Sequence, residues 1–283
     1  MDPSLALAKR GMLCYFRDRQ SVFFSLMGVL IVVMLYLLFL KNTLVSSWPD
    51  YPGMSSLVDA WVLSGILAIV PVTTCAGALQ IMVEDRSNGR DKDICVTPMP
   101  AYKVAFGYVL STFSVGTLMS YITLVICVVY LLVTGCAISF TGILISALLV
   151  IPSSLSASII MYAITSFIKS TGAFSGLYTV VSVLIGFLAG IYMPMGVMPD
   201  AMKVVGSLVP ASQMAVLFRD TLAADALNEV FIGAPADVIS SFRAEMGFDL
   251  SLGDFMFSDI AMIGYVFVAT VIFFAIAVMR IRR

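Results

Sequence analysis

The sequence predicts an all-α integral membrane protein with six transmembrane helices, and three observations lead to this fold class. Of the 283 residues, 60% are hydrophobic and 12% are charged, whereas an ordinary soluble domain is about 45–50% apolar and about 25% charged. The mean hydropathy is +1.04. The apolar residues are concentrated in six runs, each of about the 20 residues or more that a helix needs to cross a bilayer. A soluble enzyme and a disordered chain are excluded, because too few polar side chains remain to cover a globular surface.

The six apolar runs give the order of the predicted spans. The third and fourth runs are longer than a membrane is thick, so we expect these helices to tilt or to project past the headgroups. The runs occupy residues 22–40, 61–83, 104–133, 141–167, 175–193 and 260–279. They divide the chain into an N-terminal interfacial helix (1–21), spans one to five with a charged loop (22–193, loop 84–103), an outer segment (194–258), and a sixth span with a basic tail (259–283).

The distribution of charge predicts the orientation of the spans. Of the 16 basic residues, 12 lie on the side of the two termini, and Lys and Arg are enriched in cytoplasmic segments. We therefore expect a multi-pass protein of the cell membrane with both termini in the cytoplasm. Of the 17 acidic residues, 11 fall in the outer segments. We expect no cleavable signal peptide, because the first 20 residues are polar and basic.

The first segment predicts an amphipathic helix. Asp2 is a suitable N-cap and Pro3 suits the first helical position. Apolar residues then recur at helical spacing on one face, which is typical of a helix that lies in the membrane interface. The sequence favours a plain membrane anchor, and this role is compatible with docking of a cytoplasmic partner. The apolar face comprises Leu5, Ala8, Met12, Tyr15 and Phe16.

The loop 84–103 carries eight charged residues between the second and third runs. Asn88 and Gly89 indicate a turn. Residues 91–96 can form a short helix that Pro98 and Pro100 would end. A partner that pushed this helix would move two spans together. The alternative is a solvated loop whose charges only fix the orientation of the chain.

The runs contain no charged residue at their centres, and this limits how transport could be driven. Carriers coupled to protons or sodium usually keep a carboxylate or a histidine inside the membrane, and this chain has no histidine at all. The sequence also lacks the GxxxxGK[ST] phosphate loop of ATPases. If the protein transports a molecule, we expect a separate ATPase to supply the energy. We expect no metal site, and no nucleic acid partner because the net charge is only −1.

Two ordered groups of residues resemble the permease subunit of type-two ATP-binding-cassette (ABC) exporters. Around the loop they are Asp85-Arg86, Gly89, Ile94-Cys95, the Val96-Thr97-Pro98 step and Gly107. After the fifth run they are Gly190 to Pro194, Met198-Pro199, Leu208 to Pro210 and Phe218-Arg219-Asp220. The resemblance implies a non-enzymatic transmembrane subunit without a cofactor of its own. It also implies cytoplasmic ABC ATPase partners that bind ATP and magnesium, and a second permease, identical or different.

The resemblance further assigns roles to residues of the loop and of the first helix. The loop would dock mechanically and electrostatically on the ATPase, with two basic residues of the N-terminal helix beside it. The expected coupling residues are Glu84, Asp85, Arg86, Gly89, Asp91, Lys92, Asp93, Ile94 and Pro98, flanked by Arg10 and Arg17. A re-entrant helical pair is expected over residues 198–222, and residues 235–246 predict an amphipathic helix that Gly247 would end.

Small and hydroxyl-bearing residues within the runs predict where helices pack closely. Gly186 and Gly190 form a GxxxG step on the fifth span, and Gly172 and Gly176 form another at its start. Such steps bring helices together within one chain or between two copies. The substrate path implied by the resemblance lies between two copies, along the first, second and fifth spans. Our candidates for its lining are Phe23, Tyr36, Thr73, Thr74, Tyr178 and Ser182.

The sequence therefore predicts a permease that exports an apolar or amphipathic molecule, such as a drug, a peptide antibiotic or a lipid, and that contributes in this way to drug or antibiotic resistance. The 18 Met and 19 Phe residues suit a promiscuous apolar path. Two alternatives stay open at this point: an ion-coupled secondary carrier, and a non-transporting sensor or scaffold that recruits an ATPase. The segment 223–258 extends the outer region as an insertion, either a lid over the span ends or an outer gate.

Overall fold

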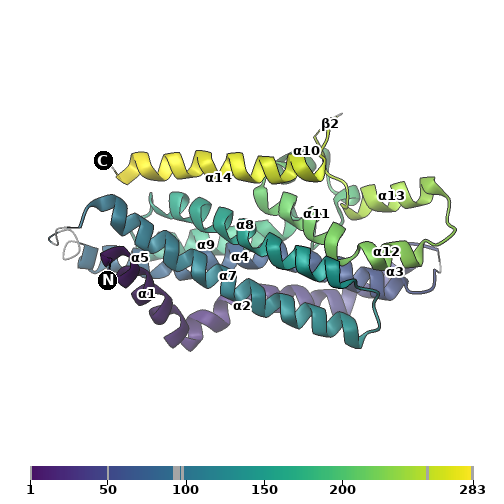
Figure 1. Ribbon diagram of the computed structural model, residues 1–283, viewed down its shortest axis with the longest axis horizontal. Coiled ribbons are helices and arrows are strands. Elements are labelled where there is room, and N and C mark those ends of the chain that lie inside the picture. The colour runs from purple at the N-terminus through teal and green to yellow at the C-terminus, as the bar shows by residue number, and fades with distance from the viewer. Residues whose placement is uncertain (1, 50, 92–95, 97–98, 253–254, 282–283) are drawn as a thin grey trace.

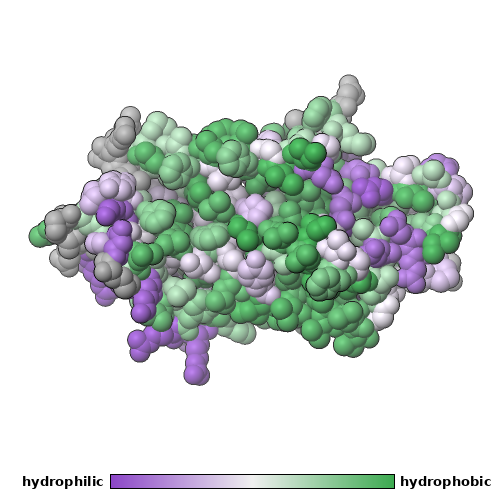
Figure 2. Space-filling model, in the orientation of Figure 1, coloured by the Kyte–Doolittle hydropathy of each residue, from purple (hydrophilic) through white to green (hydrophobic). Residues whose placement is uncertain are grey.

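The computed structural model is an elongated bundle of helices that run side by side along its longest axis, with both termini at one end (Figure 1). It describes residues 2–49, 51–91, 96, 99–252 and 255–281. The opposite end is built by short helices of the outer segment (Figure 1). Apolar side chains cover the middle of the visible face, and hydrophilic residues gather toward its two ends (Figure 2). This is the arrangement that a bilayer requires of a helical protein.

The elements follow the order expected from the sequence. The N-terminal half contains α1 (Pro3–Arg17), α2 (Arg19–Leu35), the π-helix η1 (Tyr36–Leu40), α3 (Lys41–Ser46), α4 (Met54–Ala78), α5 (Gln80–Ser87) and α7 (Ala101–Val133). The C-terminal half contains α8 (Phe140–Thr165), α9 (Thr171–Leu188), the 3₁₀ turn η2 (Met195–Val197), α10 (Asp200–Ser207), α11 (Pro210–Leu222), α12 (Ala224–Val230), α13 (Ala236–Met246), β1 (Ser251–Leu252), β2 (Phe255–Met256) and α14 (Asp259–Ile281).

Five helices of the described residues are long and apolar enough to cross a membrane. They are the helix over Met54–Ser87, made of α4 and α5, and the helices α7, α8, α9 and α14. They correspond to the predicted second to sixth runs. The first run, 22–40, is also helical along its backbone, because α2, η1 and α3 follow one another without a break. It is not among the five, so the count of six spans stays a prediction.

Helix α1 packs along α7 instead of lying alone in the interface. Its N-terminus is capped as predicted, because the Asp2 side chain accepts a hydrogen bond from the Ser4 amide. The buried face agrees with the predicted one at Ala8 and Tyr15, but Leu5 is exposed, whereas Leu7 and Gly11 are buried against the bundle. Gly107 of α7 allows this approach, since a Cβ there would lie 3.0 Å from Leu7 Cδ2 and from the Ser4 carbonyl.

Two of the predicted boundaries that differ from the structure lie beside the glycine turns. Helix α9 ends at Leu188, five residues before the predicted end, because Gly190 turns the chain with a φ of +68°. Helix α5 continues to Ser87, so Glu84, Asp85 and Arg86 lie on a helix and not in the loop. The loop proper starts at Gly89, whose φ of +73° only glycine adopts readily.

The outer segment folds over the ends of the spans. Helices α10 and α11 meet at an angle of 87°, a bent pair over the predicted residues 198–222. Helix α13 ends at Gly247 in the left-handed conformation, as the sequence predicts. A ring cluster of Trp48, Phe231, Phe242 and Phe248 joins α13 to the segment before α4. The short strands β1 and β2 pair antiparallel, with Leu252 opposite Phe255.

Candidate functional site

A buried carboxylate joins three helices at the end of the molecule that carries both termini. Asp85 of α5 has a fully buried side chain. Arg10 of α1 donates to both of its oxygens, Nη1 to Oδ2 and Nη2 to Oδ1, each at 2.7 Å. The Tyr108 hydroxyl of α7 donates to Oδ2 at 2.8 Å, and Arg90 Nη1 lies 3.8 Å from Oδ1. We call this group of Asp85, Arg10 and Tyr108 the carboxylate clasp.

The geometry of the carboxylate clasp suits a rigid connection. Two parallel hydrogen bonds from one guanidinium fix the relative orientation of the pair as well as its distance. The hydrogen bonds to Asp85 raise the pKa of Arg10, and burial, which lowers it, is the smaller effect. Arg10 thus stays charged, and the interfacial helix α1 is tied to the helical hairpin formed by α5 and α7.

The other predicted coupling residues lie in different surroundings. Arg86 Nη1 donates to the carbonyls of Ser166 and Ile168, at 3.1 Å each, and so satisfies the C-terminal end of α8. The side chain of Glu84 accepts a hydrogen bond from Gln80 at 2.7 Å, and Arg17 is exposed. Asp91 lines two polar cavities beside Arg86. The predicted residues Lys92, Asp93, Ile94 and Pro98 lie outside the described residues.

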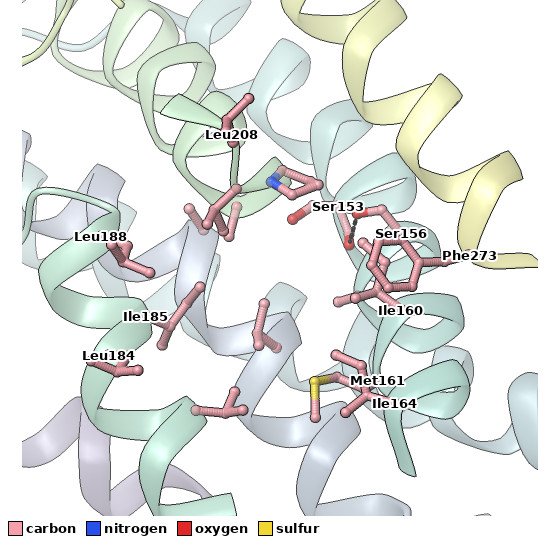
Figure 3. Close-up of a pocket in the computed structure, with 17 residues that line it drawn as sticks. Ser153, Ser156, Ile160, Met161, Ile164, Leu184, Ile185, Leu188, Leu208 and Phe273 are labelled. Carbon is pink, nitrogen blue, oxygen red and sulfur yellow. Dashed lines mark hydrogen bonds between the residues drawn. The ribbon is translucent and has the colours of Figure 1, made fainter. Parts of the chain in front are cut away.

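An apolar cavity of about 330 Å³ lies between the spans. Figure 3 shows Leu184, Ile185 and Leu188 of α9 facing Ile160, Met161 and Ile164 of α8 across it, with Phe273 of α14 at its edge. The bend between α10 and α11, from Leu208 to Ala211, closes one side. Its polar lining is Ser153 and Ser156, and the Ser156 hydroxyl already donates to the Ser153 carbonyl. The volume falls in the range of about 300–1,000 Å³ that is usual for small-molecule sites.

The predicted lining residues do not surround this cavity. Thr73 and Thr74 donate to carbonyls of their own helix one turn back, Phe23 is half exposed, and Tyr178 stacks on Phe174. The predicted residues Tyr36 and Ser182 are also absent from its lining. The cavity instead combines side chains of α4, α8, α9, α11 and α14. Apolar residues at such positions give no signal that separates them from ordinary core residues.

Tyr36 belongs to a second buried ion pair, at the other end of the bundle. Its hydroxyl donates to Asp59 Oδ1 at 2.5 Å, and Lys41 Nζ lies 2.7 Å from Asp59 Oδ2. Asp59 is 1% exposed. It is the sixth residue of α4, so the second helix begins seven residues before the predicted start at residue 61 and includes this acid near its end.

Comparison with known proteins decides the family. The chain matches the family model described as ABC-2 family transporter protein over residues 42–279, which is more than half of its length. It belongs to this family. The protein is therefore a multi-pass permease component of an ABC transporter, and this transmembrane component is not itself catalytic. No curated protein matches the chain.

The glycines of the permease's fifth span have separate roles in the structure. At Gly186 the position of a Cβ is occupied by the ring of Tyr192 from the same chain. Gly190 forms the turn after α9, and its carbonyl accepts a hydrogen bond from Arg219. Both thus serve packing inside one chain. Gly172 and Gly176, in contrast, have no neighbour within 4 Å of a built Cβ among the described residues.

Arg219 is named in the sequence analysis only as part of the Phe218-Arg219-Asp220 group, and its structural role in the permease was not predicted. Its side chain is fully buried, and it donates to the carbonyls of Gly247 at 2.8 Å, Ala189 at 3.1 Å and Gly190 at 2.9 Å. The guanidinium lies 4.9 Å from the ring centre of Trp61. Among the described residues it has no carboxylate partner. Counting charges places it among the outer basic residues, which gives no sign of these partners.

Proposed function

We propose that the permease exports an apolar or amphipathic substrate from the cytoplasm or the inner leaflet, and that separate ABC ATPase subunits supply the energy. The ATPases bind ATP and magnesium, whereas this chain binds neither. The carboxylate clasp carries the proposal. It ties α1 to α5 and α7. A movement that the ATPase imposes on the segment 84–103 would therefore reach α4 through α5, and would reach α7 directly. The end that carries both termini is the cytoplasmic end in this proposal.

The apolar cavity supports the substrate class. Its walls offer almost no hydrogen-bonding group that is not already paired, so they suit hydrocarbon and aromatic groups. An ion-coupled carrier fits less well, because the charged residues described in the five candidate spans lie near the helix ends. In our proposal the path continues between two permeases, and Phe23, Tyr36, Thr73, Thr74, Tyr178 and Ser182 remain its candidate lining.

The test uses inside-out vesicles from cells that produce the permease together with its ATPase. The readout is ATP-dependent accumulation of an amphipathic fluorescent dye, together with ATP hydrolysis by the purified complex. We expect Arg10→Ala and Asp85→Asn each to reduce dye transport at least ten-fold, because the connection between α1 and the hairpin is lost. Lys9→Ala is the matched control, since it removes an exposed charge from the same helix and should leave transport unchanged.

The segment beyond Asp91 is tested by Asp93→Ala and Ile94→Ala, which should abolish transport and the stimulated ATPase activity while the protein still inserts in the membrane. Unchanged transport in these variants and in Asp85→Asn would refute the coupling role. Transport that persists without ATP and stops when a proton or sodium gradient is dissipated would establish the ion-coupled carrier instead. An ATPase that co-purifies and hydrolyses ATP without any dye movement would establish the scaffold.

A further inference from the structure

Two adjoining polar cavities lie at the end of the bundle that carries both termini. Their volumes are about 390 Å³ and 470 Å³. They share Arg86, Asp91, Tyr162 and Arg280, and one of them also includes Lys169 and Ser166. We call them together the basic pocket. Its walls come from α5, α7, α8 and α14, so it lies where four long helices end.

The cations of the basic pocket are arranged around one short segment of chain. Arg86 holds the carbonyls of Ser166 and Ile168 from one side. Arg280 lies over the ring of Phe167, 5.5 Å from its centre, and Lys169 follows directly on this segment. Three positive groups thus converge on the residues just after α8.

Positive groups outnumber negative ones in the described lining of the basic pocket. Among the described residues, Arg86, Lys169 and Arg280 form no ion pair. Among the residues that the structure describes in the lining, Asp91 is the only acidic one, so the described positive groups exceed the negative ones by two. An unpaired cluster of this kind requires an anion or exposure to water.

A tyrosine in the lining supports a ligand in the basic pocket independently of the charges. Tyr162 is 5% exposed and lines both cavities. The side chain thus adds a hydroxyl donor to a lining that is otherwise basic, and an oxygen of a bound anion within the pocket would accept its hydrogen bond.

The surroundings favour a lipid anion over a soluble one. The lining of the basic pocket includes Met82, Val104 and Ala277, and Phe167 and Met279 beside it are each more than half exposed. Basic pockets between the ends of transmembrane helices suit anionic headgroups. The exposed apolar side chains beside the pocket suit the start of an acyl chain. We propose that the basic pocket binds the phosphate of an anionic phospholipid. This lipid lies in the leaflet that surrounds the end of the bundle carrying both termini.

The test measures retention of phosphatidylglycerol by the full-length permease, and it needs neither the ATPase nor a transported substrate. The purified protein is placed in nanodiscs of phosphatidylcholine with a minority of phosphatidylglycerol, and retained lipid is measured by native mass spectrometry. We expect the double variant Lys169→Ala, Arg280→Ala to retain the anionic lipid about 30-fold more weakly, the combined effect of two basic residues at an anionic surface. Arg86 is left unchanged because it also caps α8.

Two further variants separate a site from a diffuse attraction. Tyr162→Phe removes one hydroxyl without changing the charge, and we expect about five-fold weaker retention. Arg19→Ala removes an exposed cation outside the pocket and should have no effect. Thermal unfolding in pure phosphatidylcholine should be the same for all four proteins, which shows that folding is intact.

Three results would overturn the proposal. Equal losses of lipid in Arg19→Ala and in the double variant would show a diffuse surface effect. Displacement of the lipid by inorganic phosphate or glycerol phosphate at equal affinity would show that the pocket binds free phosphate. Full lipid retention in the double variant, with loss of ATPase co-purification, would show that these cations face the ATPase.

Discussion

Arg219 illustrates how one side chain can hold the outer part of the permease together. It bonds the end of α9 through Ala189 and Gly190, and the end of α13 through Gly247. These segments are far apart in the sequence, and one guanidinium joins them. A guanidinium offers five donors in a fixed planar fork, which is why a single residue can serve three acceptors and also lie over Trp61.

We predict that Arg219→Met destabilises the permease by roughly 3 kcal/mol, because each buried carbonyl left without a donor costs about 1–3 kcal/mol. The measurement is the thermal unfolding midpoint in detergent micelles. Lys203→Met is the control, since Lys203 forms an exposed pair with Asp200 that contributes little. Equal midpoints for Arg219→Met and the original protein would contradict this role.

Single residues with local roles could be predicted from the sequence, and those with long-range roles could not. The Asp2 cap and the Gly247 cap depend only on neighbours within four residues. The hydrogen-bond partners of Asp85 and Arg219 lie between 23 and 75 residues away. Sequence analysis named Asp85 and Arg10 in the same set, but only the resemblance to a family suggested it, and no spacing rule pairs them.

At the scale of elements, the seam between α1 and α7 determines where the N-terminal helix lies. Two glycines form it: Gly11 of α1 lies against Ser111, and Gly107 of α7 lies against Leu7. The absence of side chains there brings the two helix backbones together. The seam leads directly to the carboxylate clasp, because Arg10 precedes Gly11 and Tyr108 follows Gly107.

We predict that Gly107→Val separates α1 from α7, because overpacking a close helix contact costs about 1–3 kcal/mol. Hydrogen exchange of the α1 amides, followed by mass spectrometry, should become at least ten-fold faster. Gly264→Val is the matched control, since a Cβ at Gly264 meets nothing within 4 Å. Protection of α1 that stays unchanged in Gly107→Val would show that the seam does not depend on this glycine.

The existence of the long helices was predictable from hydropathy, but their ends were less so. The run 175–193 stays apolar through Ile191 and Met193, so hydropathy alone does not reveal that Gly190 turns the chain. Conversely, the charged residues 84–86 suggested a loop, yet they continue a helix because Asp85 and Arg86 find partners on α1 and α8. The turn at Gly190 decides the first boundary, and tertiary partners decide the second.

At the scale of the whole molecule, α9 is the least covered of the five candidate spans, with 17% of its apolar window buried. Gly172, Gly176, Val180 and Val183 follow one another at helical spacing and are all exposed. At the glycine end of this stripe the backbone of another helix can approach closely. At the other end the two valines present branched apolar side chains. It is the surface that a second permease would cover in the proposed assembly.

We predict that a photo-crosslinking amino acid at Val180 joins two permeases in the membrane, because this position lies at the proposed contact. The measurement is the yield of covalent dimer on a denaturing gel after illumination. Phe267 on α14 is the matched control, being even more exposed, and should give at least five-fold less dimer. Equal yields from the two positions would show random collisions in the membrane.

Composition was sufficient to predict a membrane protein, but the internal spaces of the molecule could not be predicted. The apolar cavity needs Phe273, Leu184 and Pro210 to face one space, and these residues come from three segments whose relative placement depends on the whole bundle. Hydroxyl-bearing residues in the spans indicated helix packing better than they indicated the lining of a substrate path. Thr73 and Thr74 serve their own helix near Pro71, and Ser154 and Ser158 are fully buried.

The wide turn η1 has a geometric consequence for the first helix. There the Lys41 amide donates to the Tyr36 carbonyl, five residues back, where an α-helix would reach only four. One additional residue in the turn rotates everything after it by about 100° around the axis relative to an uninterrupted helix. Shortening this stretch by one residue would swing Lys41 away from Asp59 and leave a negative charge stranded in the packed interior.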